Sequence, residues 1–326
     1  MKHLRLMSII VLFSIFTSGC SQSPTNEPIS KNGMFFDTVI SVTLYDSTDE
    51  SILNGCMELC KEYEEKFSKT IATSEISRIN QGAGKPVTVS DDTIALLEKG
   101  LYYGELSHGS FDITIAPLSD LWNFKDNKGV VPGETDIKEA LSHVDYRNIS
   151  IQDHTVTLKD PQSAIDLGGI AKGYIADQLK DYLKKQGVKH ALINLGGNVL
   201  AVGNKSNHTN FQIGIQKPFD KKNEPITSIA IDDQSMVSSG VYERYFKVNN
   251  TLYHHILNPN TGFPYQNDLL GVTILSEKSV DGDGLSTTCF TLGLEKGLSL
   301  INSLDHTEAV FITNDYQLHY SDGWKE

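Results

Sequence analysis

Apolar and polar residues alternate or cluster along several short segments of this 326-residue chain, as they do in strands that bury one face. The segment at 38–45 (TVISVTLY) alternates most clearly. The full set of predicted strands covers residues 38–45, 190–195, 211–216, 226–231, 252–257, 270–275 and 309–313.

Apolar residues spaced three or four apart predict four helices. Two span residues 51–67 and 170–186, and the second ends before Gly187. Another begins after Ser90, the expected N-cap, and a last one spans about 284–304. The inward-facing residues of the helix after Ser90 are expected to be Ile94, Leu97 and Leu101. Because helices and strands do not alternate as regular βαβ units, we expect one α+β domain with antiparallel sheets and packed helices.

The N-terminus has the pattern of an export signal. Two basic residues precede an apolar run at 6–16, and Thr-Ser-Gly then leads to Cys20. This arrangement resembles a bacterial lipobox, which predicts a signal peptide at 1–19 and a lipid-carrying Cys20. A lipidated cysteine and polar tether at 20–32 would then hold the domain at 33–326 on the extracytoplasmic side of the cell membrane. The alternative is a plain secretory signal in which Cys20 is incidental.

Composition excludes two other classes of protein. The chain has 28 Lys+Arg against 41 Asp+Glu, a formal charge of −13, which argues against nucleic-acid binding. After the N-terminus there is no apolar run long enough to span a bilayer, which excludes a polytopic membrane protein. Cys56, Cys60 and Cys289 lack metal-ligand companions at zinc-site spacing and are interpreted as core residues.

Two glycine-containing segments could approach a ligand. Residues 166–174 (DLGGIAKGY) lead into a predicted helix, where small residues, a helix N-terminus and Lys172 favour an anion. The segment is neither a Walker A loop nor a GxGxxG motif, and a tight strand-to-helix turn explains it equally well. Residues 194–198 (NLGGN) close a strand, either as a sharp turn or as a close approach to something bulky.

Two further segments carry side chains suited to catalysis or metal binding. His255 directly precedes an Asn-Pro-Asn-Thr-Gly turn and is either a base, an orienting donor or a core imidazole. Asp283 and Thr287 are four residues apart in a helical segment, so their oxygens face the same way and suit Mg²⁺. The alternative is helix N-capping by Asp281 or Asp283. An EF-hand is excluded because its twelfth position would be Leu292.

Taken in order, these segments resemble the ApbE family of flavin transferases. The resemblance covers residues 34–326 and is carried by FDT at 36–38, FS at 67–68, SEISRIN at 74–80, GSFDIT at 109–114, 166–173, 194–198, SGVYER at 239–244, 255–264 and 283–287. The chain departs from the family pattern at Phe36-Asp37, where Met-Gly is frequent, at Asn258, where Asp is frequent, and at Thr70, where an aromatic residue is frequent.

The resemblance implies a set of site residues. Mg²⁺ is expected at the Gly169 carbonyl, Asp283 and Thr287, with Ser286 adjacent. FAD, as substrate, is expected to contact His255 and the residues Phe36, Ser110, Phe111, Asp112, Asp166 and Lys172. Besides Asp283, His255 is the expected catalytic residue, acting as the base that activates a hydroxyl nucleophile.

The implied activity is Mg²⁺-dependent transfer of FMN from FAD to a Thr or Ser hydroxyl of an exported or membrane redox protein, with release of AMP. One alternative is a Mg²⁺-dependent FAD pyrophosphatase, which uses water in place of the acceptor. Two others are a non-catalytic flavin-binding lipoprotein and a solute-binding lipoprotein. The Asp283/Thr287 pair speaks against both binding proteins, since capture of a flavin or solute needs no Mg²⁺.

Overall fold

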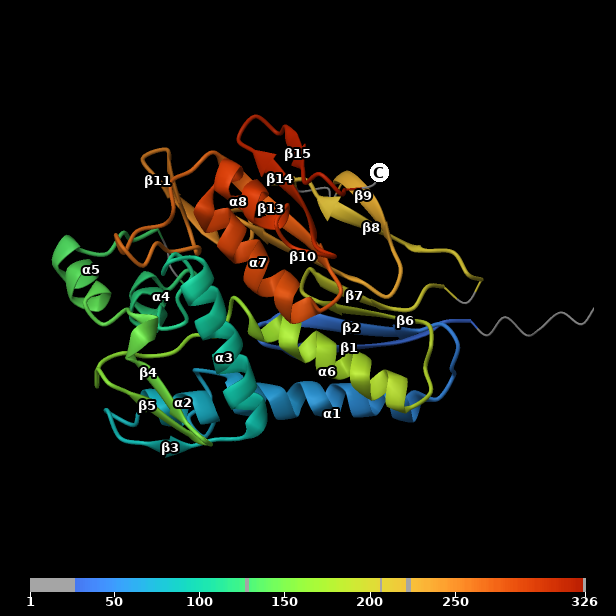
Figure 1. Cartoon of the computed structure of the whole chain (residues 1–326), viewed down its shortest axis with the longest axis horizontal. Helices are drawn as coiled ribbons and strands as arrows, with labels where there is room; N and C mark the ends of the chain where they lie inside the picture. The colour runs from blue at the N-terminus through green and yellow to red at the C-terminus, as the bar shows by residue number, and fades with distance from the viewer. Residues whose placement is uncertain (1–26, 127–128, 206, 221–223, 325–326) are drawn as a thin grey trace, which may run out of the picture.

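The computed structural model describes residues 27–126, 129–205, 207–220 and 224–324, and an eight-stranded sheet runs through its centre (Figure 1). Its neighbouring strands are antiparallel, in the order β1-β2-β6-β7-β10-β13-β14-β15. The strands are β1 (Ile29–Phe35), β2 (Thr38–Leu44), β6 (Ala191–Leu195), β7 (Asn198–Val202), β10 (Ser235–Gly240), β13 (Leu269–Ser276), β14 (Glu308–Thr313) and β15 (Leu318–Tyr320).

The predicted signal peptide and Cys20 lie outside the described residues. Strand β1 begins at Ile29 and pairs with β2 over its whole length, so the folded domain starts before residue 33 and includes part of the segment expected to be a tether. Across the described ranges, none of the helices has the length and apolar character needed to cross a membrane.

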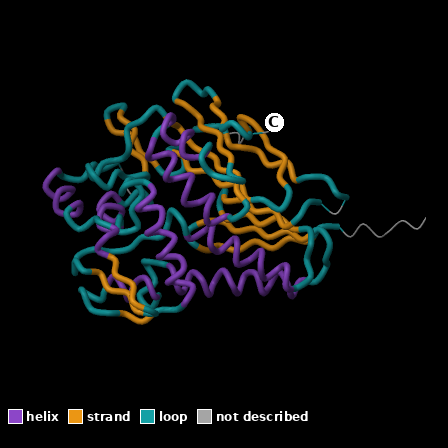
Figure 2. The backbone as a smooth tube through the Cα atoms, viewed as in Figure 1, coloured by secondary structure: helices purple, strands orange, loops and turns teal. Residues whose placement is uncertain are grey.

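Helices pack on the sheet and on one another, and Figure 2 shows them gathered beside the bundle of strands. Helix α6 (Ala171–Lys185) contacts β6 and β7, while α7 (Ser279–Leu292) contacts α6, β10 and β13. The other helices of this layer are α1 (Glu50–Phe67), α3 (Asp91–Leu106) and α8 (Leu294–Ile301). The antiparallel sheet and packed helices confirm the predicted α+β class.

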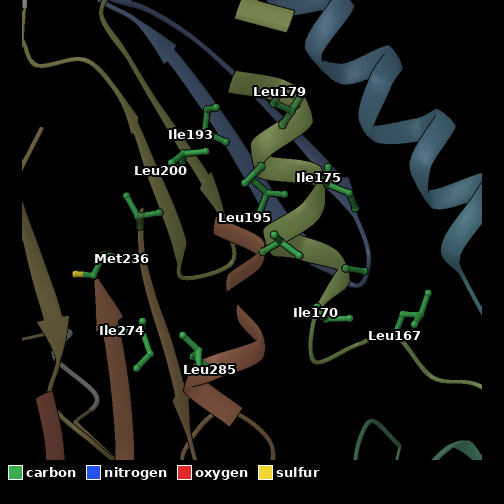
Figure 3. Packing of buried hydrophobic residues seen from close by; sticks show 14 of the residues in the cluster. Leu167, Ile170, Ile175, Leu179, Ile193, Leu195, Leu200, Met236, Ile274 and Leu285 are labelled. Carbon is green, nitrogen blue, oxygen red and sulfur yellow. The ribbon is translucent and has the colours of Figure 1, made fainter. Parts of the chain in front are cut away.

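The main core lies between α6, α7 and the sheet (Figure 3). Ile175 and Leu179 of α6 belong to the same cluster as Ile193 and Leu200 of the sheet, and all four are fully buried. Leu285 of α7 is 3% exposed and extends the same layer. Burying side chains of this size contributes about 1.5–3 kcal/mol each, so the α6–α7 pair is held firmly against the strands.

The cysteines belong to this core, as the sequence predicts. Cys56, Cys60 and Cys289 are free and fully buried. Burial raises the pKa of each thiol to about 12, which keeps all three protonated and unreactive at neutral pH.

Smaller units complete the molecule. A three-stranded sheet contains β3 (Val87–Thr88), β5 (Thr155–Leu158) and β4 (Ile149–Gln152), and two hairpins pair β8 (Phe211–Gln216) with β9 (Pro225–Ile231) and β11 (Tyr245–Val248) with β12 (Thr251–His254). The remaining helices are α2 (Glu75–Asn80), α4 (Ala116–Trp122), α5 (Glu134–Leu141) and the 3₁₀ turn η1 (Tyr146–Asn148). A second small core is formed by Leu118, Trp122, Ile137 and Leu257.

Two predicted elements differ from the structure. The helix expected at 284–304 begins earlier, at Ser279, and is divided into α7 and α8 by Gly293, whose φ of 79° no helix accommodates. The strand expected at 252–257 ends at His254, because the following residues turn toward the Asn258–Gly262 turn. Ser90 does occupy the N-cap position of α3, but its hydroxyl donates to Glu75 Oε2 (2.8 Å) rather than capping the helix.

Candidate functional site

The site is organised where the first turn of α6 crosses α7. A side chain at Gly173 would overlap the carbonyl oxygen of Ser279, so only glycine allows the two helices to approach this closely. The Gly173 N–H donates to Asp283 Oδ2 (2.9 Å), and Asp283 is 3% exposed. One carboxylate therefore joins the two helices from the inside.

Neither of the aspartates considered as an N-cap for α7 has that role. The first N–H groups of the helix, at Ser279 and Val280, donate to Asp177 of α6 at 2.8 and 2.9 Å. Asp281 instead accepts from Lys99 Nζ and Tyr103 OH, both at 2.8 Å. The N-capping alternative is wrong, and Asp283 lies in the second turn of α7 instead of at its start.

Three hydroxyl groups lie next to Asp283. Ser239, at the end of β10, lies 2.8 Å from Ser286 Oγ and 3.2 Å from Thr287 Oγ1. Ser286 is fully buried and also donates to the carbonyl of Asp283 (3.0 Å), so its hydroxyl is used inside the protein. Thr287 and Ser239 are both half-buried, so their hydroxyls are nearer the surface than that of Ser286. Ser239 has no role predicted from the sequence, although it belongs to the SGVYER segment that carries part of the family resemblance.

The loop before α6 brings Gly169 to the same place. A Cβ placed on Gly169 would lie 3.8 Å from Thr287 Oγ1 and 3.3 Å from the ring edge of Phe111. Lys172 Nζ lies 3.9 Å from Asp283 Oδ1 and donates to the Gly168 carbonyl at 3.3 Å. Gly169 and Lys172, predicted from one segment, and Asp283 and Thr287, predicted from another, are thus neighbours in space.

Asp166 is held by groups from three parts of the chain. Its Oδ1 accepts from Gly168 N (2.9 Å), and its Oδ2 accepts from Ser119 Oγ (2.8 Å) and pairs with Lys69 Nζ (2.9 Å). Burial alone would raise the pKa of Asp166, but Lys69 and these hydrogen bonds outweigh it and hold the pKa below its ordinary value. Asp166 is therefore ionised and fixed in orientation.

His255 follows β12 and is half-buried. Its Nδ1 is buried and has no hydrogen-bond partner among the described residues. Burial lowers the pKa of His255 to about 3, with smaller contributions from His254, Arg244 and Lys172 in that order. The imidazole is thus neutral at neutral pH. The backbone N–H of His255 donates to the Arg244 carbonyl at 3.1 Å, which ties the residue to the SGVYER segment.

The residues at 110–112 differ in how close they lie to the candidate site. The Phe111 ring lies against Gly169, and the Ser110 carbonyl accepts from Tyr265 OH at 3.1 Å. Asp112 is directed inward, where its carboxylate accepts from Thr114 N (2.7 Å) and Tyr146 N (2.8 Å), and burial raises its pKa. Asp112 shapes the turn, whereas Phe111 reaches the site.

Phe36 lies in the turn between β1 and β2. Both turn residues, Phe36 and Asp37, have positive φ (53° and 58°), and Phe36 N donates to Glu64 Oε1 at 2.6 Å. This turn lies beside the β6–β7 turn, since a side chain on Gly196 would overlap Thr38. The two turns end neighbouring hairpins of the main sheet.

The donor set near Asp283 fits a hard cation. It offers a carboxylate, the Thr287 hydroxyl and the backbone of Gly169, the oxygen donors that Mg²⁺ prefers. No cluster of three or more His, Cys, Asp or Glu side chains suited to a metal occurs within the described ranges. The donor set at Asp283 has one carboxylate, and its other donors are a hydroxyl and a backbone carbonyl, so it is not a cluster of that type.

These features define a single-domain α+β protein with an oxygen-donor site between two helices, flanked by a lysine. The ApbE family model matches residues 36–311, and the chain belongs to the ApbE family. A Klebsiella pneumoniae (strain 342) protein named FAD:protein FMN transferase is 37% identical over 293 residues, covering 89% of this chain and 90% of that protein. A Treponema pallidum (strain Nichols) protein of the same name is 31% identical and covers 97% of this chain and 93% of its own.

Solved structures show the same fold. The ApbE protein of Thermotoga maritima superposes with a TM-score of 0.83 at 30% identity, covering 91% of this chain and 97% of that one. The flavin transferase ApbE from Vibrio cholerae superposes with a TM-score of 0.81 at 25% identity and the same coverage. Family membership and the α+β fold predicted from sequence are both confirmed.

Proposed function

We propose that this chain transfers FMN from FAD to a Thr or Ser hydroxyl of another protein and releases AMP. The observation that carries the proposal is the meeting of Asp283, Thr287 and Gly169 beside Lys172. Enzymes that cleave a pyrophosphate need oxygen ligands for a cation, a positive charge near the phosphates and a base for the nucleophile. The named function of the matched relatives supports the same reaction.

Asp283, Thr287 and the Gly169 carbonyl would hold Mg²⁺. When bound, this ion supplies charge neutralisation to the phosphate oxygens. Ser286 and Ser239 would hold these ligands in place. Their hydroxyls are bonded to one another, Ser286 also donates to the Asp283 carbonyl, and Ser239 also bonds the Thr287 hydroxyl. Lys172 adds a positive charge next to the same oxygens, and Asp166, Phe111 and Phe36 are the proposed FAD contacts.

In the proposed reaction, the acceptor hydroxyl oxygen attacks the phosphorus of FAD that carries the riboflavin moiety. The bond from that phosphorus to the bridging oxygen breaks, and AMP leaves with the bridging oxygen. His255 is the proposed acceptor of the hydroxyl proton, since its imidazole is unprotonated at neutral pH. Its pKa of about 3 is low for a base, and the negative phosphates of bound FAD would raise it toward the value that the step needs. The product is a phosphoester between FMN and the acceptor side chain.

The setting of this activity follows from the N-terminal sequence. A lipid on Cys20 would confine the enzyme to the extracytoplasmic face of a membrane, and its acceptors would be exported or membrane redox proteins. Confinement to a surface raises the effective concentration of acceptors on the same surface.

The test uses the purified domain with FAD, Mg²⁺ and an acceptor bearing a flavinylation-type threonine. We expect an FMN adduct on the acceptor by mass spectrometry, with an equal amount of AMP. AMP and free FMN without an adduct, repeated with a second acceptor, would instead establish a pyrophosphatase. Intact FAD bound to the protein without AMP would establish a flavin-binding protein and refute both enzymatic functions.

A further inference from the structure

Lys69 is a half-buried lysine that no part of the proposed reaction uses. It lies in the connection between α1 and α2, and its side chain is 22% exposed. The ammonium has three partners: Ser119 Oγ at 2.7 Å, Asp120 Oδ1 at 2.5 Å and Asp166 Oδ2 at 2.9 Å. An ammonium group has three N–H donors, so all of them are used within the protein.

The partners of Lys69 belong to separate segments. Ser119 and Asp120 are on α4, and Asp166 begins the loop that precedes α6. Ser119 Oγ also donates to Asp166 Oδ2, so lysine, hydroxyl and carboxylate form a closed triangle. A neutral side chain in place of Lys69 would leave the half-buried Asp166 carboxylate without its cation. An unpaired charge at such a position lowers stability.

The fixed carboxylate sets the path of the loop. Asp166 Oδ1 accepts from Gly168 N, which bends the chain so that the next residue, Gly169, faces Phe111 and Thr287. The Gly168 carbonyl in turn accepts from Lys172 Nζ. Two lysines therefore hold the loop, Lys69 from outside the site and Lys172 from within it.

We propose that Lys69 is a positioning residue for FAD binding: through Asp166 it holds the 166–169 loop in the conformation that receives FAD. The inference rests on the proposed function of this site. Lys69 does not reach the reacting atoms, because its donors are occupied by Ser119, Asp120 and Asp166.

Lys66 offers a matched control. It is 20% exposed and bridges two carboxylates, Glu62 and Asp92, both at 2.8 Å. It thus has the same charge environment as Lys69 but contacts α1 and α3 instead of the loop. Replacing either lysine by Met removes one ammonium between two acids, and only Lys69→Met releases Asp166.

The experiment measures FAD binding by flavin fluorescence without an acceptor, and FMN transfer separately. We expect Lys69→Met to weaken FAD binding and raise the KM for FAD about tenfold with a smaller change in kcat, the loss typical of one charge-assisted hydrogen bond. Lys69→Arg should restore most of the affinity. Lys66→Met should change the thermal midpoint without changing FAD affinity.

A pH profile separates positioning from general destabilisation. Lys69 of the α1–α2 connection is the charged group that pairs with Asp166, with Asp120 of α4 behind it. Without Lys69, burial raises the pKa of Asp166, so FAD affinity of Lys69→Met should fall as the pH is lowered from 7 to 5. Affinity of the unmodified chain and of Lys66→Met should change less over this range.

Equal FAD affinity and equal pH profiles for Lys69→Met and Lys66→Met, with FMN transfer intact in the unmodified chain, would overturn the role of Lys69 alone. Absence of FAD binding by the unmodified chain would overturn the proposed function and this inference together.

Discussion

Asp283 connects structure and chemistry at the scale of a single residue. Its Oδ2 accepts from Gly173 N, which ties α6 to α7, while Oδ1 lies 3.9 Å from Lys172 Nζ. Oδ2 therefore holds the two helices together, while Oδ1 faces the Lys172 ammonium. Because Asp283 is 3% exposed, any change of its charge alters the balance with Lys172.

Asp283→Asn is expected to raise the Mg²⁺ concentration needed for half-maximal FMN transfer by at least about tenfold, since even groups that only orient a metal ligand cost that much. The amide oxygen can still accept from Gly173 N, so the fold should persist. Titration of activity with Mg²⁺ measures the effect, and circular dichroism checks the fold.

Asp281→Asn is the control, because Asp281 lies on the same helix but pairs with Lys99 and Tyr103. Its Mg²⁺ requirement should match that of the unmodified chain. An unchanged Mg²⁺ requirement in Asp283→Asn would show that this carboxylate does not hold the metal.

At the scale of the elements, the N-terminus of α7 depends on α6. Asp177 accepts from the first two N–H groups of α7, and burial raises its pKa to about 6. The raised pKa shows that burying the Asp177 carboxylate is unfavourable. In return, Asp177 fixes where α7 begins, and α7 carries Asp283 and Thr287. A cap supplied by another helix sets the register of α7 against α6.

Asp177→Ala leaves both N–H groups without this acceptor and should lower the free energy of unfolding by about 1–3 kcal/mol. Asp177→Asn keeps one acceptor and should lose less. Urea denaturation at pH 7 measures both. Equal stability of Asp177→Ala and the unmodified chain would mean that water caps α7 equally well.

A second element-scale dependence concerns the turn after His255. Trp122 Nε1 donates to the Gly262 carbonyl at 2.8 Å, and a side chain on Gly262 would contact Ile137. Helices α4 and α5 thus anchor the far end of the segment that begins with His255. The rings of Phe124 and Tyr253 stack on Trp122, each with its centroid 5.6 Å away, and hold the indole in place.

Trp122→Phe keeps an aromatic ring but loses this hydrogen bond. We expect kcat for FMN transfer to fall about tenfold with FAD affinity nearly unchanged, because a small displacement of His255, the proposed base, is costly. Phe124→Leu removes a neighbouring ring and keeps the Trp122–Gly262 bond, so its kcat should change less. If both variants lose kcat equally, general loosening of this small core is the cause.

Local patterns in the sequence predicted the elements whose signal is local. Strand β8 matches its predicted bounds, and helix α6 ends before Gly187, whose φ is 83°. The start of α7 was missed because its cap comes from Asp177, about a hundred residues away in the chain. The small elements α4, α5 and β11 were missed because each buries few apolar residues and has little periodicity.

The same distinction applies to the site. Asp283 and Thr287 were found because a helix places residues four apart on one face. Lys69, Ser119 and Ser239 were not assigned, because nothing near them in sequence shows that they meet Asp166 or Thr287. Asp112 was expected to contact FAD, and only the folded chain shows its carboxylate bonded to Thr114 and Tyr146.

At the scale of the whole molecule, the main sheet is the base on which distant segments converge. Asp166 N donates to the Ile113 carbonyl at 2.8 Å, and a parallel bridge joins Ile115 to Ala164, so the 110–114 strip and the loop before α6 run side by side. The site is complete only when the chain from β1 to α7 has folded. Stability of the whole domain and integrity of the site should therefore change together.

Acid stability tests this coupling. Burial lowers the pKa of His254 to about 4 and of His255 to about 3, both from 6.5 in the unfolded chain. As pH falls below 6.5, the unfolded state gains up to two protons that the folded state does not, so stability decreases. Asp177 acts in the opposite direction, because its pKa of about 6 lies above 3.8 and the folded state holds its proton first.

Between pH 6 and 4 these three groups leave a net difference of about one proton, which corresponds to about 1.4 kcal/mol of stability lost per pH unit. Asp177→Asn removes the opposing group and should steepen the loss to about two protons, whereas His254→Gln should nearly abolish it. Glutamine can still donate to the Tyr265 carbonyl, which His254 Nε2 contacts at 2.9 Å. Free energies of unfolding in urea at several pH values give these slopes, and comparison of variants cancels the carboxylates common to all of them. Identical slopes in the three proteins would show that neither His254 nor Asp177 is as buried in solution as the packing around α6 and α7 requires.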